Sequence, residues 1–248
     1  MKNLTANDTL DFNAVEWTLY ELDHLREDQE LLRQAKSCFD LERKAFEEVA
    51  SRFKSNPEAR REVSSEALEA LLLSGSDRSD IRTDPTITNY FIFHTEGYET
   101  SILNKDIIVQ RSKVDHIISR KVKAIFKGSD LTIQNSGLLF YPPGGYIGWH
   151  TNSRVPGWRL YINYVEEPGK SFFRYWDSEA KEIITRWDTG YDFRLFKVDQ
   201  KKLFWHAVYS DTYRYSIGYR IVGPSEPSLL NQIGRFFKIS PSKGSGME

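Results

Sequence analysis

Two histidines and an asparagine in the second half of the chain have the residue types and spacing of a metal site. His150 and Asn152 follow a Gly-rich stretch, and His206 lies some fifty residues further on, also directly after a Trp. In a β-strand, residues i and i+2 point to the same face, so a strand at 147–152 would present an imidazole and a side-chain oxygen together. We therefore predict that His150, Asn152 and His206 share one metal ion at the centre of a catalytic site.

A second group of polar residues follows His206. Arg214 lies eight residues beyond it and begins the alternating stretch Arg-Tyr-Ser-Ile-Gly-Tyr-Arg, in which Arg214, Ser216 and Arg220 would share one strand face. A planar guanidinium binds a carboxylate through two parallel hydrogen bonds, and a nearby hydroxyl adds a third. The spacing therefore predicts a carboxylate-binding site close to the candidate metal.

In order and spacing, these residues resemble the 2-oxoglutarate- and Fe(II)-dependent oxygenases, with features of the prolyl-4-hydroxylase-like and AlkB-like branches. The resemblance rests on four pieces: Tyr-x-Pro-Gly beginning at Tyr141, the His-x-acid position at His150, His-Ala-Val at His206, and Arg-x-Ser at Arg214. It covers about residues 137–221, roughly a third of the chain. None of the pieces is specific alone, so the resemblance depends on their combination and order.

The resemblance implies that His150 and His206 bind Fe(II) and that Arg214 holds the distal carboxylate of the co-substrate 2-oxoglutarate. Tyr141 and Ser216 would assist, and Arg220 matches a second arginine of the AlkB-like branch. The implied activity is that of a dioxygenase, an oxidoreductase that hydroxylates or oxidatively dealkylates a peptide side chain, nucleobase or small metabolite. The same reaction would convert 2-oxoglutarate to succinate and CO2.

Asn152 departs from the family pattern, because an acidic ligand is expected at this position. An amide oxygen is neutral and a weaker donor than a carboxylate, so iron affinity should fall. This leaves two hypotheses: a working oxygenase, or a catalytically retired jelly-roll domain that serves as a binding module. The presence of both histidines, of Tyr141 and of the Arg-x-Ser pair favours the oxygenase, since a retired module does not need all of them.

Composition limits the class of protein. The 248 residues, 40% of them hydrophobic, can bury a large core, and the net charge of -1 gives no global signal for nucleic-acid binding. The single cysteine, Cys38, cannot form an internal disulfide, which is typical of a reducing compartment. No signal peptide or membrane span is evident. We expect a cytoplasmic protein with no membrane partner.

The pattern of apolar residues predicts a mainly β protein with flanking helices (α+β). Residues 1–75 have helical periodicity, whereas from residue 131 onward short apolar runs alternate with turn residues, as in an antiparallel sandwich or barrel. The family resemblance selects the double-stranded β-helix, or jelly roll. The expected parts are an N-terminal helical segment at 1–80, an oxygenase domain at 85–222 and a tail at 223–248. The strands are expected at 131–134, 137–141, 147–152, 158–165, 171–177, 181–187, 192–198, 202–208 and 213–221.

Other candidates have structural interpretations. An aromatic strand is expected at 89–94 and a helix at 113–126, and their histidines, His94 and His116, have no second ligand at a useful spacing. The basic residues of that helix are interpreted as a solvated face rather than a phosphate-binding surface; they are Arg111, Lys113, Arg120, Lys121 and Lys123. Aromatic residues that could stack on a flat substrate at the mouth of the site are Tyr146, Trp158, Tyr161, Tyr175 and Trp176.

Overall fold

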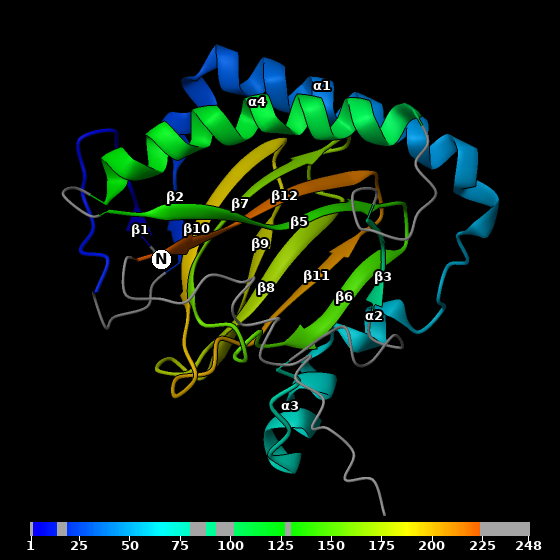
Figure 1. Ribbon diagram of the computed structural model, residues 1–248. Coiled ribbons are helices and arrows are strands. Elements are labelled where there is room, and N and C mark those ends of the chain that lie inside the picture. Colours follow the sequence, from blue (N-terminus) through cyan, green and yellow to red (C-terminus); the bar gives the residue numbers. More distant parts are fainter. Residues whose placement is uncertain (1, 14–18, 80–87, 93–101, 127–129, 224–248) are drawn as a thin grey trace, which may run out of the picture.

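A computed structural model describes residues 2–13, 19–79, 88–92, 102–126 and 130–223. These residues form two mostly antiparallel sheets and a few helices, so the expectation of an α+β protein rich in strands is confirmed. Figure 1 shows the two sheets below a layer of two long helices. Among the described residues, no helix combines the length and apolar composition needed to cross a lipid bilayer.

The larger sheet has seven strands in the order β1-β2-β10-β7-β12-β5-β4. Among these described strands, only the β1–β2 pair is parallel. In chain order, they are β1 (Lys2–Asn3), β2 (Tyr20–Glu21), β4 (Phe91–Ile92), β5 (Thr132–Tyr141), β7 (Gly157–Val165), β10 (Tyr191–Val198) and β12 (Arg214–Val222).

The smaller sheet has five strands in the order β3-β6-β11-β8-β9, all paired antiparallel. Its strands are β3 (Thr88–Asn89), β6 (Gly145–His150), β8 (Ser171–Asp177), β9 (Glu182–Trp187) and β11 (His206–Ser210). The chain crosses repeatedly between the two sheets, because β5, β7, β10 and β12 of the larger sheet alternate along the sequence with β6, β8–β9 and β11 of the smaller one.

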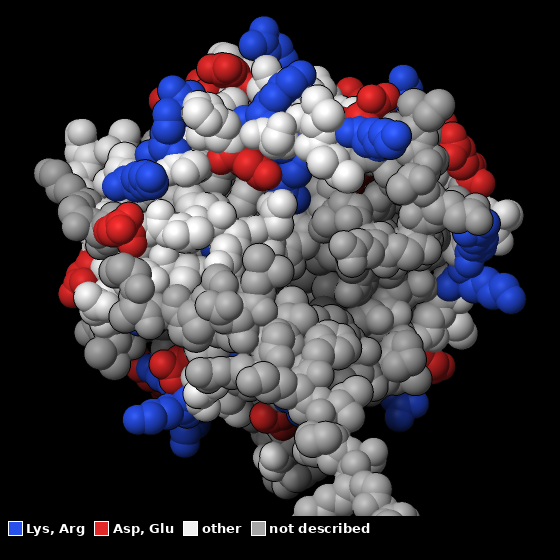
Figure 2. Space-filling view, viewed as in Figure 1, with Lys and Arg blue, Asp and Glu red and all other residues white. Residues whose placement is uncertain are grey.

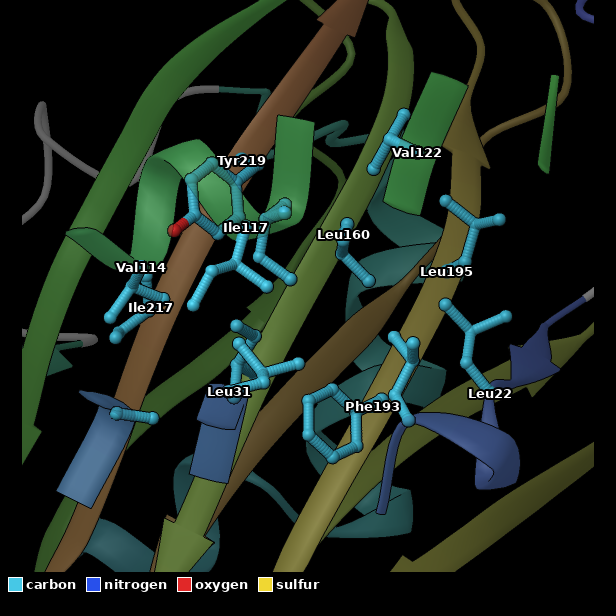
Figure 3. Close-up of a cluster of buried hydrophobic side chains, with 14 of the residues drawn as sticks. Leu22, Leu31, Val114, Ile117, Val122, Leu160, Phe193, Leu195, Ile217 and Tyr219 are labelled. Carbon is cyan, nitrogen blue, oxygen red and sulfur yellow. The ribbon is translucent and has the colours of Figure 1, made fainter. Parts of the chain in front are cut away.

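The helices lie outside the sheets. In Figure 1, α1 (Gln29–Val49) and α4 (Ile102–Ile125) run side by side over the larger sheet, while α2 (Ala59–Glu62) and α3 (Ser65–Ser74) lie near β6 of the smaller one. Two 3-10 segments, η1 (Asp23–Glu27) and η2 (Ala50–Arg52), flank α1. Figure 3 shows the apolar layer that α1 and α4 cover, which includes Leu31, Ile117, Leu160, Phe193 and Ile217.

Strand β12 shows how the alternation of the sequence directs side chains. Tyr215 and Ile217 belong to the core beneath the helices, whereas Arg214 and Ser216 line a cavity between the sheets. Neighbouring residues of a strand point to opposite faces, so one strand supplies both layers. The alternation read from the sequence is therefore confirmed, and it directs the polar residues away from the helices.

Several predicted boundaries need correction. The runs at 131–134 and 137–141 are a single strand, β5, with a bulge opposite Gly218 and Tyr219 of β12. The N-terminal region is not wholly helical, because β1 and β2 extend the larger sheet through the pairing of β2 with β10. The helix expected at 113–126 begins earlier, at Ile102. His94 and nearly all of the tail lie outside the described residues.

The basic face predicted for α4 is only partly solvated. Arg111 is buried, forms an ion pair with Asp115, and donates hydrogen bonds to the carbonyl oxygens of Gly137 and Gly218 and to the side chain of Asn135. It therefore fixes α4 to the β5–β12 bulge, where backbone carbonyls lack their regular partners. The prediction of a solvated face is wrong at this position.

Glu42 interrupts the apolar face of α1, and its side chain is fully buried. Its Oε1 accepts a hydrogen bond from the Cys38 thiol (3.8 Å), and its Oε2 has no partner within the described residues. Burial raises the pKa of Glu42 well above its usual value, and nearby Arg111 offsets only part of this effect. A carboxyl group whose pKa is raised on folding stabilises the fold below its unfolded pKa and destabilises it as pH rises.

We therefore expect Glu42→Gln to be more stable than the wild type at pH 8 and nearly equal to it at pH 4, because glutamine mimics the protonated acid. Denaturant unfolding at the two pH values measures the difference. Glu47→Gln, on the exposed face of the same helix, is the matched control and should show no such trend. A Glu42→Gln variant that is destabilised equally at both pH values would contradict the expectation.

Candidate functional site

His150 and His206 lie opposite each other on two paired strands. His150 is the last residue of β6 and His206 the first of β11, and they are register partners with ring centroids 4.0 Å apart. A register shift in this pair separates His206 from Val208, so that Ile147 and His150, three residues apart, both line the cavity between the sheets. The structure thus brings the two predicted metal ligands together.

A glycine-containing bend of unusual geometry connects β5 to β6, the strand that carries His150. Gly144 has φ +83°, and a Cβ on Gly145 would lie only 2.8 Å from the carbonyl oxygen of Pro142. Only glycine adopts the first conformation readily and fits the second position. The bend lets β5 end at Tyr141 in the larger sheet while β6 enters the smaller sheet, with Tyr141 and His150 lining the same cavity.

Hydrogen bonds fix the tautomer of both rings. Nδ1 of His150 donates to the Gly148 carbonyl oxygen (2.8 Å), and Nδ1 of His206 donates to that of Phe204 (2.8 Å). Because a carbonyl oxygen can only accept, Nε2 carries the lone pair of each neutral ring. Burial lowers the pKa of His150 to about 4 and that of His206 well below its usual value. Both imidazoles are therefore neutral at pH 7, which is the form that binds a metal.

Asn152 lies beside the histidines, but not for the reason that the sequence suggested. Strand β6 ends at His150, and Asn152 has φ +55°, in the left-handed region that asparagine and aspartate tolerate best among residues with a side chain. Its amide nitrogen donates to Nε2 of His206 over 3.3 Å. A half-turn of the amide group would place the oxygen there instead. The three predicted ligands are thus adjacent, although Asn152 is outside the strand.

Arg214 and Ser216 meet at one neighbouring side chain. Nη2 of Arg214 and Oγ of Ser216 both donate to Oδ1 of Asn163 on β7, each over 2.8 Å. Tyr141 lies beside them, with its ring centroid 5.1 Å from the Arg214 guanidinium, and its own burial raises its pKa. The predicted carboxylate-binding residues therefore form a compact group, in which Tyr141 remains a neutral phenol.

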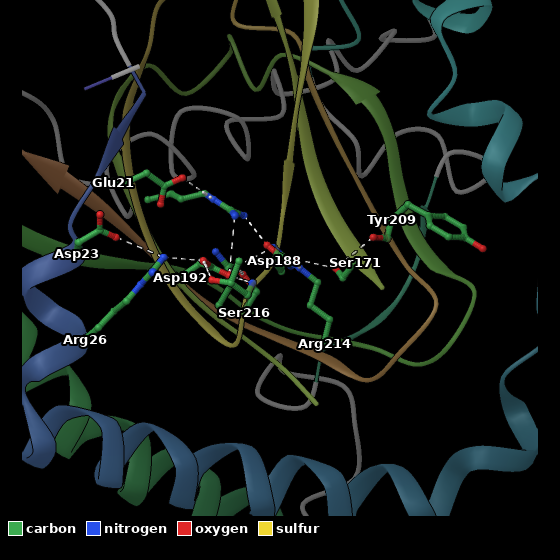
Figure 4. A network of polar contacts seen from close by, with 12 residues as sticks. Glu21, Asp23, Arg26, Ser171, Asp188, Asp192, Tyr209, Arg214 and Ser216 are labelled. Atoms are coloured by element: carbon green, nitrogen blue, oxygen red, sulfur yellow. Dashed lines mark hydrogen bonds and ion pairs between the residues drawn. The ribbon is translucent and has the colours of Figure 1, made fainter. Parts of the chain in front are cut away.

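Asp188 holds this group in place from behind. Its carboxylate accepts hydrogen bonds from Nε of Arg214 (3.0 Å), from Nη1 of Arg194 on β10 (2.6 Å) and from Oγ of Ser171 (2.6 Å). Figure 4 shows Asp188, Arg214 and Ser171 close together in one network of polar contacts. Burial alone raises the pKa of Asp188, but Arg194 and Arg214 more than offset that effect and lower it to about 2. Asp188 is therefore an anion that orients two guanidinium groups.

One cavity between the sheets joins the two sets of residues. The described residues that line it include both histidines and two arginines but no carboxylate. Asp188 contacts both arginines but does not line the cavity. The lining residues are Leu139, Tyr141, Ile147, His150, Tyr161, Asn163, Phe173, Arg194, Phe196, His206, Val208, Arg214 and Ser216. The two histidines, Arg214 and Ser216 thus face a common space, whereas the third predicted metal ligand, Asn152, is not among the lining residues.

Some predicted residues lie elsewhere. Arg220 is on the same strand as Arg214 but does not line the cavity; it donates instead to the Pro156 carbonyl oxygen (3.2 Å) and to Gln134 (3.4 Å). Of the five aromatic residues proposed for the mouth, only Tyr161 lines the cavity. Trp158, for example, packs against Phe126 in the core beneath the helices.

Sequence reasoning missed Asn163, Asp188 and Arg194. Asn163 and Arg194 are inward positions of two strands, and alternation alone marks such residues, although it does not say which are functional. Asp188 lies in the short connection between β9 and β10. No sequence signal links it to Arg214, because the contact joins residues 26 positions apart along the chain.

The residues fit a divalent transition metal in part. Two neutral imidazoles with Nε2 lone pairs and an adjacent amide suit such an ion, whereas a carboxylate ligand is missing from this group. Within the described residues there is no cluster of three or more His, Cys, Asp or Glu side chains that would hold a metal ion. A metal bound here would therefore have two nitrogen ligands and an amide oxygen from these residues.

Comparison with known proteins gives no independent assignment: neither the family models nor the curated proteins contain a match to this chain. The face shown in Figure 2 gives no strong signal for nucleic acid among its described residues either. On the face shown in Figure 2, the described Lys and Arg side chains lie among Asp and Glu side chains, with both signs present over the helical layer. The functional argument thus rests on the cavity.

Proposed function

We propose that this protein is a 2-oxoglutarate- and Fe(II)-dependent dioxygenase and that its two sheets form a double-stranded β-helix. The observation that carries the proposal is the common cavity, in which two facing neutral imidazoles open onto the same space as the Arg214–Ser216 group. A metal-chelating dicarboxylate needs both features at once. The alternation of strands between two antiparallel sheets is also the arrangement expected of this fold.

Each residue has a role in this proposal. His150, His206 and the amide oxygen of Asn152 hold Fe(II), which would supply the oxidative chemistry that converts 2-oxoglutarate to succinate and CO2. Arg214 and Ser216 bind the distal carboxylate of the co-substrate, and Asn163 and Asp188 fix the orientation of the guanidinium. The apolar cavity walls limit the access of water. The substrate is a peptide side chain, a nucleobase or a small metabolite.

A retired binding module is the second candidate, and Asn152 is the observation in its favour. The neutral amide weakens the metal site, and its nitrogen already donates to Nε2 of His206, the atom that would bind the metal. In that case the cavity would take up an anionic ligand at Arg214 without any redox chemistry. The two candidates differ in whether iron binds at all.

The Asn152→Asp variant distinguishes the oxygenase from the binding module. The left-handed backbone at this position accepts aspartate, so the variant should fold, and an anion next to a dication is stabilised far more than a neutral dipole. For an oxygenase, we expect Fe(II) affinity to rise about tenfold or more. Anaerobic titration with Fe(II) and 2-oxoglutarate measures it, through the weak metal-to-ligand charge-transfer band of the chelate.

Asn7→Asp makes the same change of charge at an exposed position and serves as the control. It should bind Fe(II) as the wild type does. Turnover of 2-oxoglutarate to succinate, measured in parallel, adds a second readout. A binding module would hold no iron in either the wild type or Asn152→Asp, and the variant would have a lower melting temperature, because the new carboxylate would be desolvated without a partner.

A further inference from the structure

The helical layer contains a groove that the proposed function does not use. It has a volume of about 410 Å³ and shares no lining residue with the cavity between the sheets. Ligand sites have volumes of about 300–1,000 Å³, so the groove is large enough to receive part of another molecule. Residues of two antiparallel helices line it: Glu30 and Gln34 of α1, and Ser112, Lys113, His116 and Arg120 of α4.

The charge of this groove is positive. Lys113 and Arg120 contribute two cations to its lining, and Glu30 contributes one carboxylate. Lys123, one turn beyond Arg120 on α4, is exposed and adds a third cation. With the described residues none of these three cations forms an ion pair, although Lys113 donates a hydrogen bond to the side chain of Gln110 (3.0 Å). Three cations against one carboxylate leave a positive surplus.

Two other carboxylates near α4 do not cancel this surplus. Asp28, which caps α1, pairs with Lys121 of α4 (2.6 Å), and Asp115 of α4 pairs with the buried Arg111 (2.7 Å). Each pair is neutral by itself. The cations of the groove are therefore available to an anionic partner.

The spacing of the polar side chains on α4 indicates the shape of such a partner. Positions 113, 116, 120 and 123 are three or four residues apart, so Lys113, His116, Arg120 and Lys123 share one face of the helix. This face extends over about 15 Å, which is too long for a single phosphate or carboxylate ion. Acidic side chains on one face of another helix recur at the same distances.

Exposed apolar side chains continue the same face. Ile108 and Val109 are 53% and 59% exposed, and Val109 lies one turn before Lys113. An amphipathic helix can cover such side chains with its own apolar residues, whereas a phosphate backbone cannot. In Figure 2 the described Lys and Arg side chains over the helical layer alternate with acidic ones, so they form no continuous basic surface for nucleic acid.

We propose that the groove between α1 and α4 binds an acidic amphipathic helix of another protein. The carboxylates of that helix pair with Lys113 and Arg120, and its apolar side chains cover Ile108 and Val109. The partner then packs on α1 and α4 as a third helix, by the ridge-and-groove contacts that helices make in bundles. The surface is separate from the cavity between the sheets, so this inference does not depend on the proposed oxygenase activity.

The experiment uses a fluorescent synthetic peptide of about 20 residues, long enough to form a helix, with the repeating unit Glu-Leu-Ala-Glu-Glu-Leu-Ala. Anisotropy measures its binding to the full chain. We expect the double charge reversal Lys113→Glu and Arg120→Glu to weaken binding about tenfold or more, because two attractive pairs become repulsive. Lys44→Glu with Lys54→Glu makes the same change of net charge at exposed positions outside the groove. This control should stay within about twofold of the wild type, since salt screens distant charges.

A second pair of measurements separates a helical partner from nucleic acid. The double variant Ile108→Ser and Val109→Ser should weaken binding of the acidic peptide, and the wild type should bind that peptide more tightly than single-stranded oligothymidine. Circular dichroism verifies that each variant is folded, which we expect because every substituted side chain is exposed.

Three results would overturn the inference. The first is that the acidic peptide binds no better than the same sequence with lysine in place of glutamate. The second is that the control reversal at Lys44 and Lys54 weakens binding as much as the reversal in the groove, which would show a response to net charge alone. The third is tighter binding of oligothymidine, unaffected by the changes at Ile108 and Val109, which would assign the surface to nucleic acid.

Discussion

Arg214→Ala should abolish most of the affinity for 2-oxoglutarate and also weaken the fold. Loss of a charge-assisted, fork-shaped contact costs about 1.5–3 kcal/mol of binding, which corresponds to roughly a 10- to 150-fold weaker complex. Because Arg214 is buried against Asp188, its removal leaves a desolvated carboxylate with fewer partners. Such losses cost about 3–5 kcal/mol of stability. The sequence suggested the first effect, and the network around Asp188 adds the second.

Calorimetry with 2-oxoglutarate and denaturant unfolding measure the two effects separately. Arg214→Lys should recover part of each, because an ammonium group can pair with Asp188 but cannot also offer a planar fork to the carboxylate of the co-substrate. Arg174→Ala is the matched control: Arg174 donates to Thr185 and to the Val63 carbonyl oxygen, and it does not line the cavity. Equal 2-oxoglutarate affinity in the wild type and in a folded Arg214→Ala protein would contradict the proposal that Arg214 binds the co-substrate carboxylate.

Acid should destabilise the metal-free protein in two separate pH windows. The buried His150 has its pKa lowered from 6.5 to about 4, so the unfolded chain binds more protons between these values and stability falls as pH falls from about 6.5 to 4. A difference of this size is worth about 3 kcal/mol. His206 acts in the same direction. Asp188, whose pKa is lowered from 3.8 to about 2, defines the second window, because its contribution to stability is lost as the pH falls from about 3.8 to 2.

Denaturant unfolding at a series of pH values, with a chelator present, measures the first window. His150→Gln should flatten the decline between pH 6.5 and 4, because its side chain does not titrate. His116→Gln, on the exposed face of α4, should leave the decline as it is, since that ring is in contact with water in the folded state as well. Parallel stability curves for the wild type and His150→Gln would show that His150 is not desolvated.

Local patterns in the sequence were sufficient for several elements. Helix α3 follows Ser64, whose side chain accepts from the Ala67 amide, and is followed by Gly75 at φ +68°; both residue types are common helix caps at these positions. The alternation at Arg214 and Ser216 correctly placed both on one face of β12. Such features depend on backbone periodicity and on contacts within a few residues, so a single sequence contains them.

The sequence was less reliable where a contact spans the two sheets or a strand departs from regular geometry. The two-residue strands β1 and β2 carry too little pattern to be recognised, and they form because β10 offers an edge. Arg220 shares the alternation of Arg214, yet the cavity does not reach it. Periodicity gives the face of a strand but not the position along it at which a cavity opens.

The amino-acid sequence by itself determined which residues we propose for the chemistry: two histidines for a metal, an arginine and a serine for a carboxylate, and an asparagine in place of an acid. Only the tertiary structure decided how they meet. Pairing of β6 with β11 brought the centroids of the two imidazole rings to 4.0 Å, and the approach of Asp188 to both Arg194 and Arg214 oriented the two guanidinium groups. Both sets of contacts join residues that are distant along the chain. A pattern in a single sequence does not show which strands pair, nor which partner a buried charge will find.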